Sequence, residues 1–147
     1  MATFARHADV DWTGGLLDGS GTAKAGSGAF SVPVTFPSRI AEQADGKTTP
    51  EEFMAAAHAV CYAMVLTNTI SKKGGTLTRL RVTATITADK SDAGIKVASS
   101  HLDAQVHGLT GIEASGLQAL ATDAEKGCPI SNAIRGSVDI TVTARAV

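Results

Sequence analysis

The stretch TTPEEFMAAAHAVCYAM, from Thr48 to Met64, holds the clearest helix start in the chain and decides the fold. Thr49 is a candidate N-cap residue, Pro50 takes the first helical position, and Glu52 stands three residues after Thr49. This order is the capping-box pattern, with proline where its missing N–H costs nothing. We expect the helix to end near Ser71, where two lysines and two glycines follow.

The residues of this helix leave it little polar face, so we expect it to be central and mostly buried. Glu51 and Glu52 suit the positive end of its dipole. Cys61 lies in the middle of the apolar part, where a cysteine is usually inert packing.

The rest of the chain predicts short strands, a hairpin, a second helix and a last strand. Pro33 predicts an edge or irregular strand within 28–36, and a polar loop should follow at 37–47. A phase change in the alternation predicts a β-bulge near Ser99–Ser100. The other expected elements are a strand at 5–14, a hairpin of strands at 80–88 and from 95 onward, a helix at 111–126 and a strand at 138–144. This order predicts an α+β fold, with helices packed on an antiparallel sheet.

Composition narrows the class of protein. The chain has 147 residues, 44% hydrophobic residues, 18% charged residues and a net charge of −1, which indicates one globular domain over 1–147. The sequence contains no basic stripe, so we expect no nucleic-acid partner. The longest nearly apolar run, 53–66, has 14 residues, which is too few to span a bilayer. The N-terminus also lacks a signal-peptide pattern. We therefore expect no membrane partner and a cytoplasmic location. In a reducing compartment, two cysteines are more often free or catalytic than paired.

The second cysteine, Cys128, lies in the segment KGCPISNAI. Gly127 should end one helix and Pro129 should begin a short one, and a helix N-terminus favours the thiolate form of a cysteine. One thiol fixed in a helix and one at a joint fit a cycle in which the first is oxidised to a sulfenic acid and the second condenses with it.

Arg39 and Glu51 are candidate partners of Cys61. Glu51 lies ten residues before Cys61, roughly 15 Å along a helix axis, so it cannot touch the thiol through its own helix. It can instead orient Arg39, since arginine–carboxylate pairs are rigid, and a fixed arginine near a thiol stabilises the thiolate.

Each feature also has a structural interpretation. A buried Cys61 can be packing, Arg39 a solvated charge, and Glu51 a helix-capping residue. His58, one turn before Cys61, is either a base for the thiol or a hydrogen-bonded core histidine. The other histidines, His7, His101 and His107, show no metal-ligand spacing, so we expect no metal site.

Both cysteine motifs resemble those of the osmotically inducible protein C and organic hydroperoxide resistance (OsmC/Ohr) family. The helix motif TTPEEFMAAAHAVCYAM is similar to the family's N/T-P-E-E/Q helix with its cysteine, and KGCPISNAI is similar to its later G-C-P-[IV]-S segment. The segments VDWTG, DAG and GIEAS extend the resemblance over nearly the whole chain. TGGLLDGSG lacks the arginine of the Ohr branch, whereas PSRI supplies Arg39, so the chain resembles the OsmC branch.

The resemblance implies a thiol-dependent peroxidase that reduces organic hydroperoxides, and hydrogen peroxide more slowly. Cys61 would be the peroxidatic cysteine, Cys128 the resolving cysteine that forms the Cys61–Cys128 disulfide, and Glu51 the acid that holds Arg39. The family fold is an intertwined α+β homodimer with a long central helix, and its active sites lie at the subunit interface. The resemblance implies no cofactor or metal, only an external dithiol of the dihydrolipoyl type or a lipoylated protein. The alternatives are a cysteine-based hydrolase that uses Cys61 with His58, and a non-catalytic protein that binds a lipid-like ligand.

Overall fold

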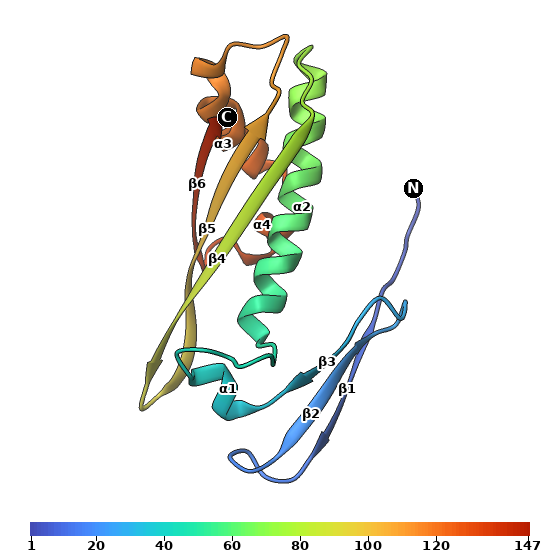
Figure 1. The fold of residues 1–147 in the computed structure, drawn as a ribbon, viewed down its shortest axis with the longest axis vertical. Helices are drawn as coiled ribbons and strands as arrows, with labels where there is room; N and C mark the ends of the chain where they lie inside the picture. Colours follow the sequence, from blue (N-terminus) through green and yellow to red (C-terminus); the bar gives the residue numbers. More distant parts are fainter. The chain divides into compact units, whose positions relative to one another are not determined.

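The computed structural model describes all residues 1–147, which form two compact units, Met1–Phe53 and Met54–Val147 (Figure 1). The prediction of a single domain over 1–147 stays a prediction. The long helix α2, Pro50–Lys72, begins in the first unit and continues through the second.

The first unit is a three-stranded antiparallel sheet followed by a short helix. Its strands pair in the order β1 (Ala8–Thr13), β2 (Ser20–Ala25) and β3 (Ser31–Val34). Pro33 lies on β3, at the edge of this sheet, as its missing N–H predicted.

A short helix α1, Phe36–Ile40, occupies the start of the segment predicted to be a loop, so the prediction of a loop over 37–47 is wrong there. Thr35 is its N-cap, and the Thr35 hydroxyl accepts a hydrogen bond from the Ser38 backbone N–H at 3.2 Å. A threonine cap followed by a proline within the first turn is the same signal that starts α2.

The second unit packs helices on a three-stranded sheet in the order β4-β5-β6. Its strands are β4 (Arg79–Ser91), β5 (Gly94–His107) and β6 (Asp139–Ala146), and its other helices are the 3₁₀ turn η1 (Ala114–Gly116), α3 (Leu117–Lys126) and α4 (Pro129–Ile134). The pairing of β4 with β5 shifts register after Thr87, because Thr87 faces Ser99 while Ala88 faces Val97. The extra residue is Ala98, which confirms the predicted bulge within one residue.

The sheet of the second unit is mixed rather than wholly antiparallel, because β6 runs parallel to β5. A parallel pair needs a crossover connection, and the helices η1, α3 and α4 supply it. The second predicted helix therefore begins later than expected, at Leu117 after the 3₁₀ turn, instead of at Gly111. The α+β class of the prediction is confirmed.

The start of α2 has the predicted cap. The Glu52 backbone N–H donates to the Thr49 hydroxyl at 3.2 Å, which satisfies one of the free donors of the first turn. The Glu52 carboxylate does not return to Thr49 but accepts a hydrogen bond from the Thr48 hydroxyl at 2.9 Å.

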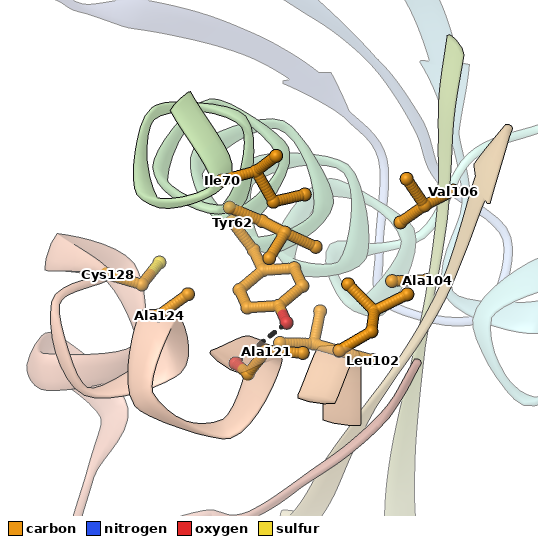
Figure 2. Close-up of a cluster of buried hydrophobic side chains, with 10 residues drawn as sticks. Tyr62, Ile70, Leu102, Ala104, Val106, Ala121, Ala124 and Cys128 are labelled. Atoms are coloured by element: carbon orange, nitrogen blue, oxygen red, sulfur yellow. Dashed lines mark hydrogen bonds between the residues drawn. The ribbon is translucent and has the colours of Figure 1, made fainter. Parts of the chain in front are cut away.

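One stripe of α2 forms the centre of the core. Its fully buried residues recur every four positions, at His58, Tyr62, Leu66 and Ile70. The last three of these residues pack with Leu102, Ala104 and Val106 of β5 and with Leu117, Ala121 and Ala124 of α3. Figure 2 shows Tyr62 within this cluster, with its hydroxyl donating to the Ala121 carbonyl oxygen at 2.9 Å.

The opposite face of α2 is exposed, so the prediction of a mostly buried helix is not met within one chain. Val60 is 55% exposed and Met64 is 69% exposed. The helix has 23 residues, longer than the apolar run seen in the sequence, and is long and apolar enough to cross a membrane by length and composition alone. One such helix is weak evidence, since the core helix of a globular protein passes the same test.

Candidate active site

The structure brings the two cysteines together. Cys61 is half-buried near the middle of α2, and Cys128 is fully buried at the N-cap of α4. Both are free thiols, and Cys61 packs against the buried cluster that contains Cys128. Residues that are 67 positions apart in the sequence therefore share one site.

The local backbone explains the position of Cys128. Gly127 caps α3, and its N–H donates to the Ala124 carbonyl oxygen at 3.0 Å. The Cys128 N–H donates to the Glu125 carbonyl oxygen at 3.0 Å, and its own carbonyl oxygen accepts the Asn132 N–H at 2.9 Å as α4 begins. Cys128 thus lies at the joint between two helices, as the GCP segment predicted.

Burial raises the pKa of the Cys61 thiol above its ordinary value. The Ile130 backbone N–H opposes this by donating a hydrogen bond to the sulfur, while the hydrogen bond and charge of Cys128 raise the pKa further. Within the second unit, the balance of these effects favours the thiol over the reactive thiolate.

His58 is a core histidine with both ring nitrogens bonded. Its Nδ1 lies 2.7 Å from the Ser100 Oγ and its Nε2 lies 2.8 Å from the Ser131 Oγ. Burial lowers the pKa of His58, and the Glu125 carboxylate partly opposes this, so the ring is neutral near pH 7. Since both nitrogens are bonded to serines, this arrangement leaves neither free to act as a base for Cys61.

A partly buried ion pair spans the segment that carries Cys128. Glu125 of α3 is 7% exposed, and its carboxylate accepts a hydrogen bond from the Arg135 guanidinium at 2.7 Å. Arg135 is the C-cap of α4, so the pair ties the end of α3 to the end of α4.

Sequence reasoning missed Ser100, Ser131 and Glu125, although two of them leave a signal in the pattern. Ser100 occupies an inward position of β5, in phase with Leu102. Glu125 occupies the buried face of α3, four residues after Ala121. A polar residue at a position that the periodicity places inside needs a buried partner.

Arg39 and Glu51 form a two-pronged ion pair in the first unit. The Arg39 Nη2 lies 2.7 Å from the Glu51 Oε1, and the Arg39 Nε donates to the same oxygen at 3.0 Å. Burial alone would raise the pKa of Glu51, but the hydrogen bonds and charge of Arg39, together with hydrogen bonds from the Glu51 backbone and Thr49, hold the pKa below its ordinary value. The predicted pairing of these residues is present, on α1 and the first turn of α2.

Arg39 lines an apolar cavity of about 470 Å³ in the first unit. The other walls are Val10, Trp12, Leu16, Ala23, Val34, Thr35, Phe36, Thr48, Pro50 and Phe53. Phe53 is held by Phe30, with ring centroids 5.4 Å apart. The cavity suits an apolar molecule that places one polar group near the guanidinium.

The protein-family model described as OsmC-like protein matches residues 43–143. Peroxiredoxin OsmC of Escherichia coli is 31% identical over 139 residues, which cover 94% of this chain and 95% of that protein. Organic hydroperoxide resistance protein OhrA of Bacillus subtilis is 32% identical over 104 residues, 69% of this chain and 70% of that protein. The chain therefore belongs to the OsmC-like family.

The fold agrees with this assignment. The crystal structure of an organic hydroperoxide resistance protein from Elizabethkingia anophelis superposes with a TM-score of 0.78 at 23% identity, over 99% of both chains. The names of the curated relatives bear out the predicted class of enzyme, a cysteine-based peroxidase, and a redox function connected with peroxides.

The Arg39–Glu51 pair should stabilise the fold in a pH-dependent way. We expect Glu51→Gln to lower the free energy of unfolding by about 2 kcal/mol at pH 7, since the variant loses the charge-assisted bonds. Because the native pKa of Glu51 lies below the unfolded value of 4.5, the contribution is complete above that value and is lost as the pH falls through the native pKa. Urea unfolding followed by circular dichroism from pH 7 to pH 3 measures this. Glu52→Gln is the matched control, and an equal loss in both variants would contradict the prediction.

Proposed function

We propose that this protein reduces organic hydroperoxides to alcohols through a Cys61 sulfenic acid and a Cys61–Cys128 disulfide. The Cys61 thiolate attacks the terminal oxygen of the hydroperoxide, the O–O bond breaks, and the alkoxide takes a proton and leaves as the alcohol. The Cys128 thiol then attacks the Cys61 sulfur, the S–O bond breaks, and the hydroxyl leaves with the Cys128 proton as water.

The proximity of the two thiols is the observation that supports this proposal most directly, since Cys61 packs against the buried cluster that contains Cys128, and Cys128 raises the pKa of Cys61. Their unequal burial supports the order of events, because a peroxide can reach the half-buried Cys61 more readily than the fully buried Cys128.

The proposal gives Arg39 and Glu51 the roles implied by the family resemblance. Arg39, oriented by Glu51, favours the Cys61 thiolate and helps to position the peroxide. A cation is the group that the thiol needs, because burial raises its pKa. The two-pronged geometry of the ion pair supports a positioning role, since it fixes the plane of the guanidinium.

The substrate and reductant follow from the same chemistry. The apolar cavity beside Arg39 favours an alkyl or aryl hydroperoxide over hydrogen peroxide. An external dithiol of the dihydrolipoyl type, free or on a lipoylated protein, returns the disulfide to two thiols by exchange. The proposed cycle uses no metal or other cofactor and takes place in the cytoplasm.

We also propose that the protein works as a homodimer. The exposed face of α2 carries Val60 and Met64, together with Ala56 and Ala57. An apolar helix face left in water favours burial against a second copy of the chain. The resemblance adds that active sites of the family lie at the subunit interface.

The structure disfavours the hydrolase alternative, because Ser100 and Ser131 occupy both ring nitrogens of His58. The cavity is the feature that a ligand-binding alternative would use. In that case the two thiols would be packing and would not respond to peroxide.

One equivalent of cumene hydroperoxide should form the Cys61–Cys128 disulfide within seconds, as read by intact mass and peptide mapping. Cys61→Ser should lower turnover on the order of 10³-fold or more, because it removes the nucleophile. Cys128→Ser should instead complete one turnover and keep a Cys61 sulfenic acid that dimedone traps. Unmodified thiols in the folded, reduced protein would support the ligand-binding alternative.

Arg39→Gln should slow the reaction of Cys61 with peroxide about tenfold or more at pH 7, because the thiol loses a stabilising cation. The rate should recover as the pH rises, since thiolate then forms without help. Stopped-flow kinetics from pH 6 to pH 10 measures this. Arg145→Gln is the matched control, because Arg145 also pairs with a carboxylate, Asp103, at 2.7 Å. An unchanged pH–rate profile in Arg39→Gln would remove Arg39 from the mechanism.

The wild-type protein should sediment as a dimer at micromolar concentration. Met64→Asp should shift it toward monomer, because a carboxylate would be buried in the interface. Thr83→Asp adds the same charge on the exposed face of β4 and should leave the dimer intact. A monomeric wild-type protein, or an equally stable Met64→Asp dimer, would contradict the proposed assembly.

A further inference from the structure

A buried chain of three polar side chains connects α2, β5 and α4. His58 of α2 lies between Ser100 of β5 and Ser131 of α4, and all three residues are fully buried. A buried polar group costs free energy unless its hydrogen bonds are made, and here each side chain has a partner. Such a network fixes the positions of the elements that it joins.

Two members of this polar network lie three residues from a cysteine in the sequence. His58 is three residues before Cys61 on α2, and Ser131 is three residues after Cys128 at the start of α4. On α2 this spacing places His58 and Cys61 on the same face, while Cys128 is the N-cap residue directly before α4. The His58–Ser131 hydrogen bond therefore joins the two segments that carry Cys61 and Cys128.

The rest of the α4 segment is held at its ends. The Glu125–Arg135 ion pair joins the residues that flank it. Gly127, just before Cys128, lies close to α2, because a Cβ atom added to this glycine would be 3.7 Å from the Val65 Cγ1. The Ser131–His58 hydrogen bond runs directly from α4 to the helix that carries Cys61, and it joins two side chains that are both fully buried. The Ile130 backbone N–H, which donates to the Cys61 sulfur, links the same two helices.

We propose that His58 and Ser131 are positioning residues for the resolving step, and that they hold α4 so that the Cys128 sulfur stays within reach of the Cys61 sulfenic acid. This inference rests on the proposed peroxidase function. In this step the S–S bond forms, the S–O bond of the sulfenic acid breaks, and water leaves with the Cys128 proton.

If the network were purely structural, removing either serine hydroxyl would have the same effect on the rate of disulfide formation, because each hydroxyl makes one hydrogen bond to the same ring. A positioning role makes them unequal, since Ser131 is attached to the Cys128 segment whereas Ser100 belongs to the sheet. Ser100→Ala is therefore a closely matched control for Ser131→Ala.

The test separates the two chemical steps in full-length protein that starts fully reduced. Stopped-flow reaction with cumene hydroperoxide measures oxidation of Cys61, and quenched-flow mass spectrometry measures the sulfenic acid, its dimedone adduct and the disulfide. In Ser131→Ala we expect oxidation of Cys61 within about twofold of wild type and disulfide formation slowed about tenfold or more, because a small misplacement of a reacting group is costly. The sulfenic acid should accumulate, and excess peroxide should convert more of it to sulfinic acid.

Ser100→Ala should form the disulfide within about twofold of the wild-type rate, although its thermal stability falls as in Ser131→Ala. His58→Leu removes both hydrogen bonds and replaces the ring with a side chain of similar volume. It should show the same selective slowing, and it takes the place of Ser131→Ala in the test if that variant does not fold. Equal slowing in both serine variants, or wild-type disulfide formation in Ser131→Ala and His58→Leu, would overturn the inference. Failure of the proposed function differs, because the wild-type protein itself would then form no sulfenic acid and no disulfide.

Discussion

Every fourth residue of α2 from His58 to Ile70 is buried, and the packing of this stripe fixes the surroundings of Cys61. Tyr62, in the same stripe, fills the core and donates its hydroxyl to the Ala121 carbonyl of α3, so the helix cannot rotate without leaving a buried polar group unpaired. Cys61 follows His58 by three residues and therefore lies at the border of the stripe, half-buried beside the core. The chemistry of the thiol is set by this position.

That position has opposing effects on reactivity. Burial protects the sulfur and brings it to Cys128, but the same burial raises its pKa and favours the unreactive thiol. The Ile130 N–H acts in the other direction. A nucleophile in such a place depends on a further positive group, and the proposed mechanism assigns this role to Arg39, which Glu51 holds by two hydrogen bonds. The two-pronged pair fixes the plane of the guanidinium, which suits a positioning role in addition to its contribution to stability.

Local signals in the sequence predicted the start of α2, the hairpin, its bulge and the joint at Cys128. They failed where partners are distant in sequence. The parallel pairing of β6 depends on the crossover through α3 and α4, and periodicity does not give strand direction. The pairing of Arg39 with Glu51 could be predicted from residue types and the resemblance. The links from His58 to Ser100 and Ser131 span 42 and 73 residues and leave only a weak trace, a serine at an inward position of β5.

The unequal exposure of the two sulfur atoms has a consequence for the direction of thiol exchange. In a disulfide that keeps the positions of the reduced pair, Cys61 is the more accessible cysteine, while Cys128 remains fully buried. An incoming dithiol would then join Cys61 in the mixed disulfide, with Cys128 as the leaving group. The recycling reagent and the peroxide would approach the same atom, so substrate and reductant would compete for one entrance and alternate in time.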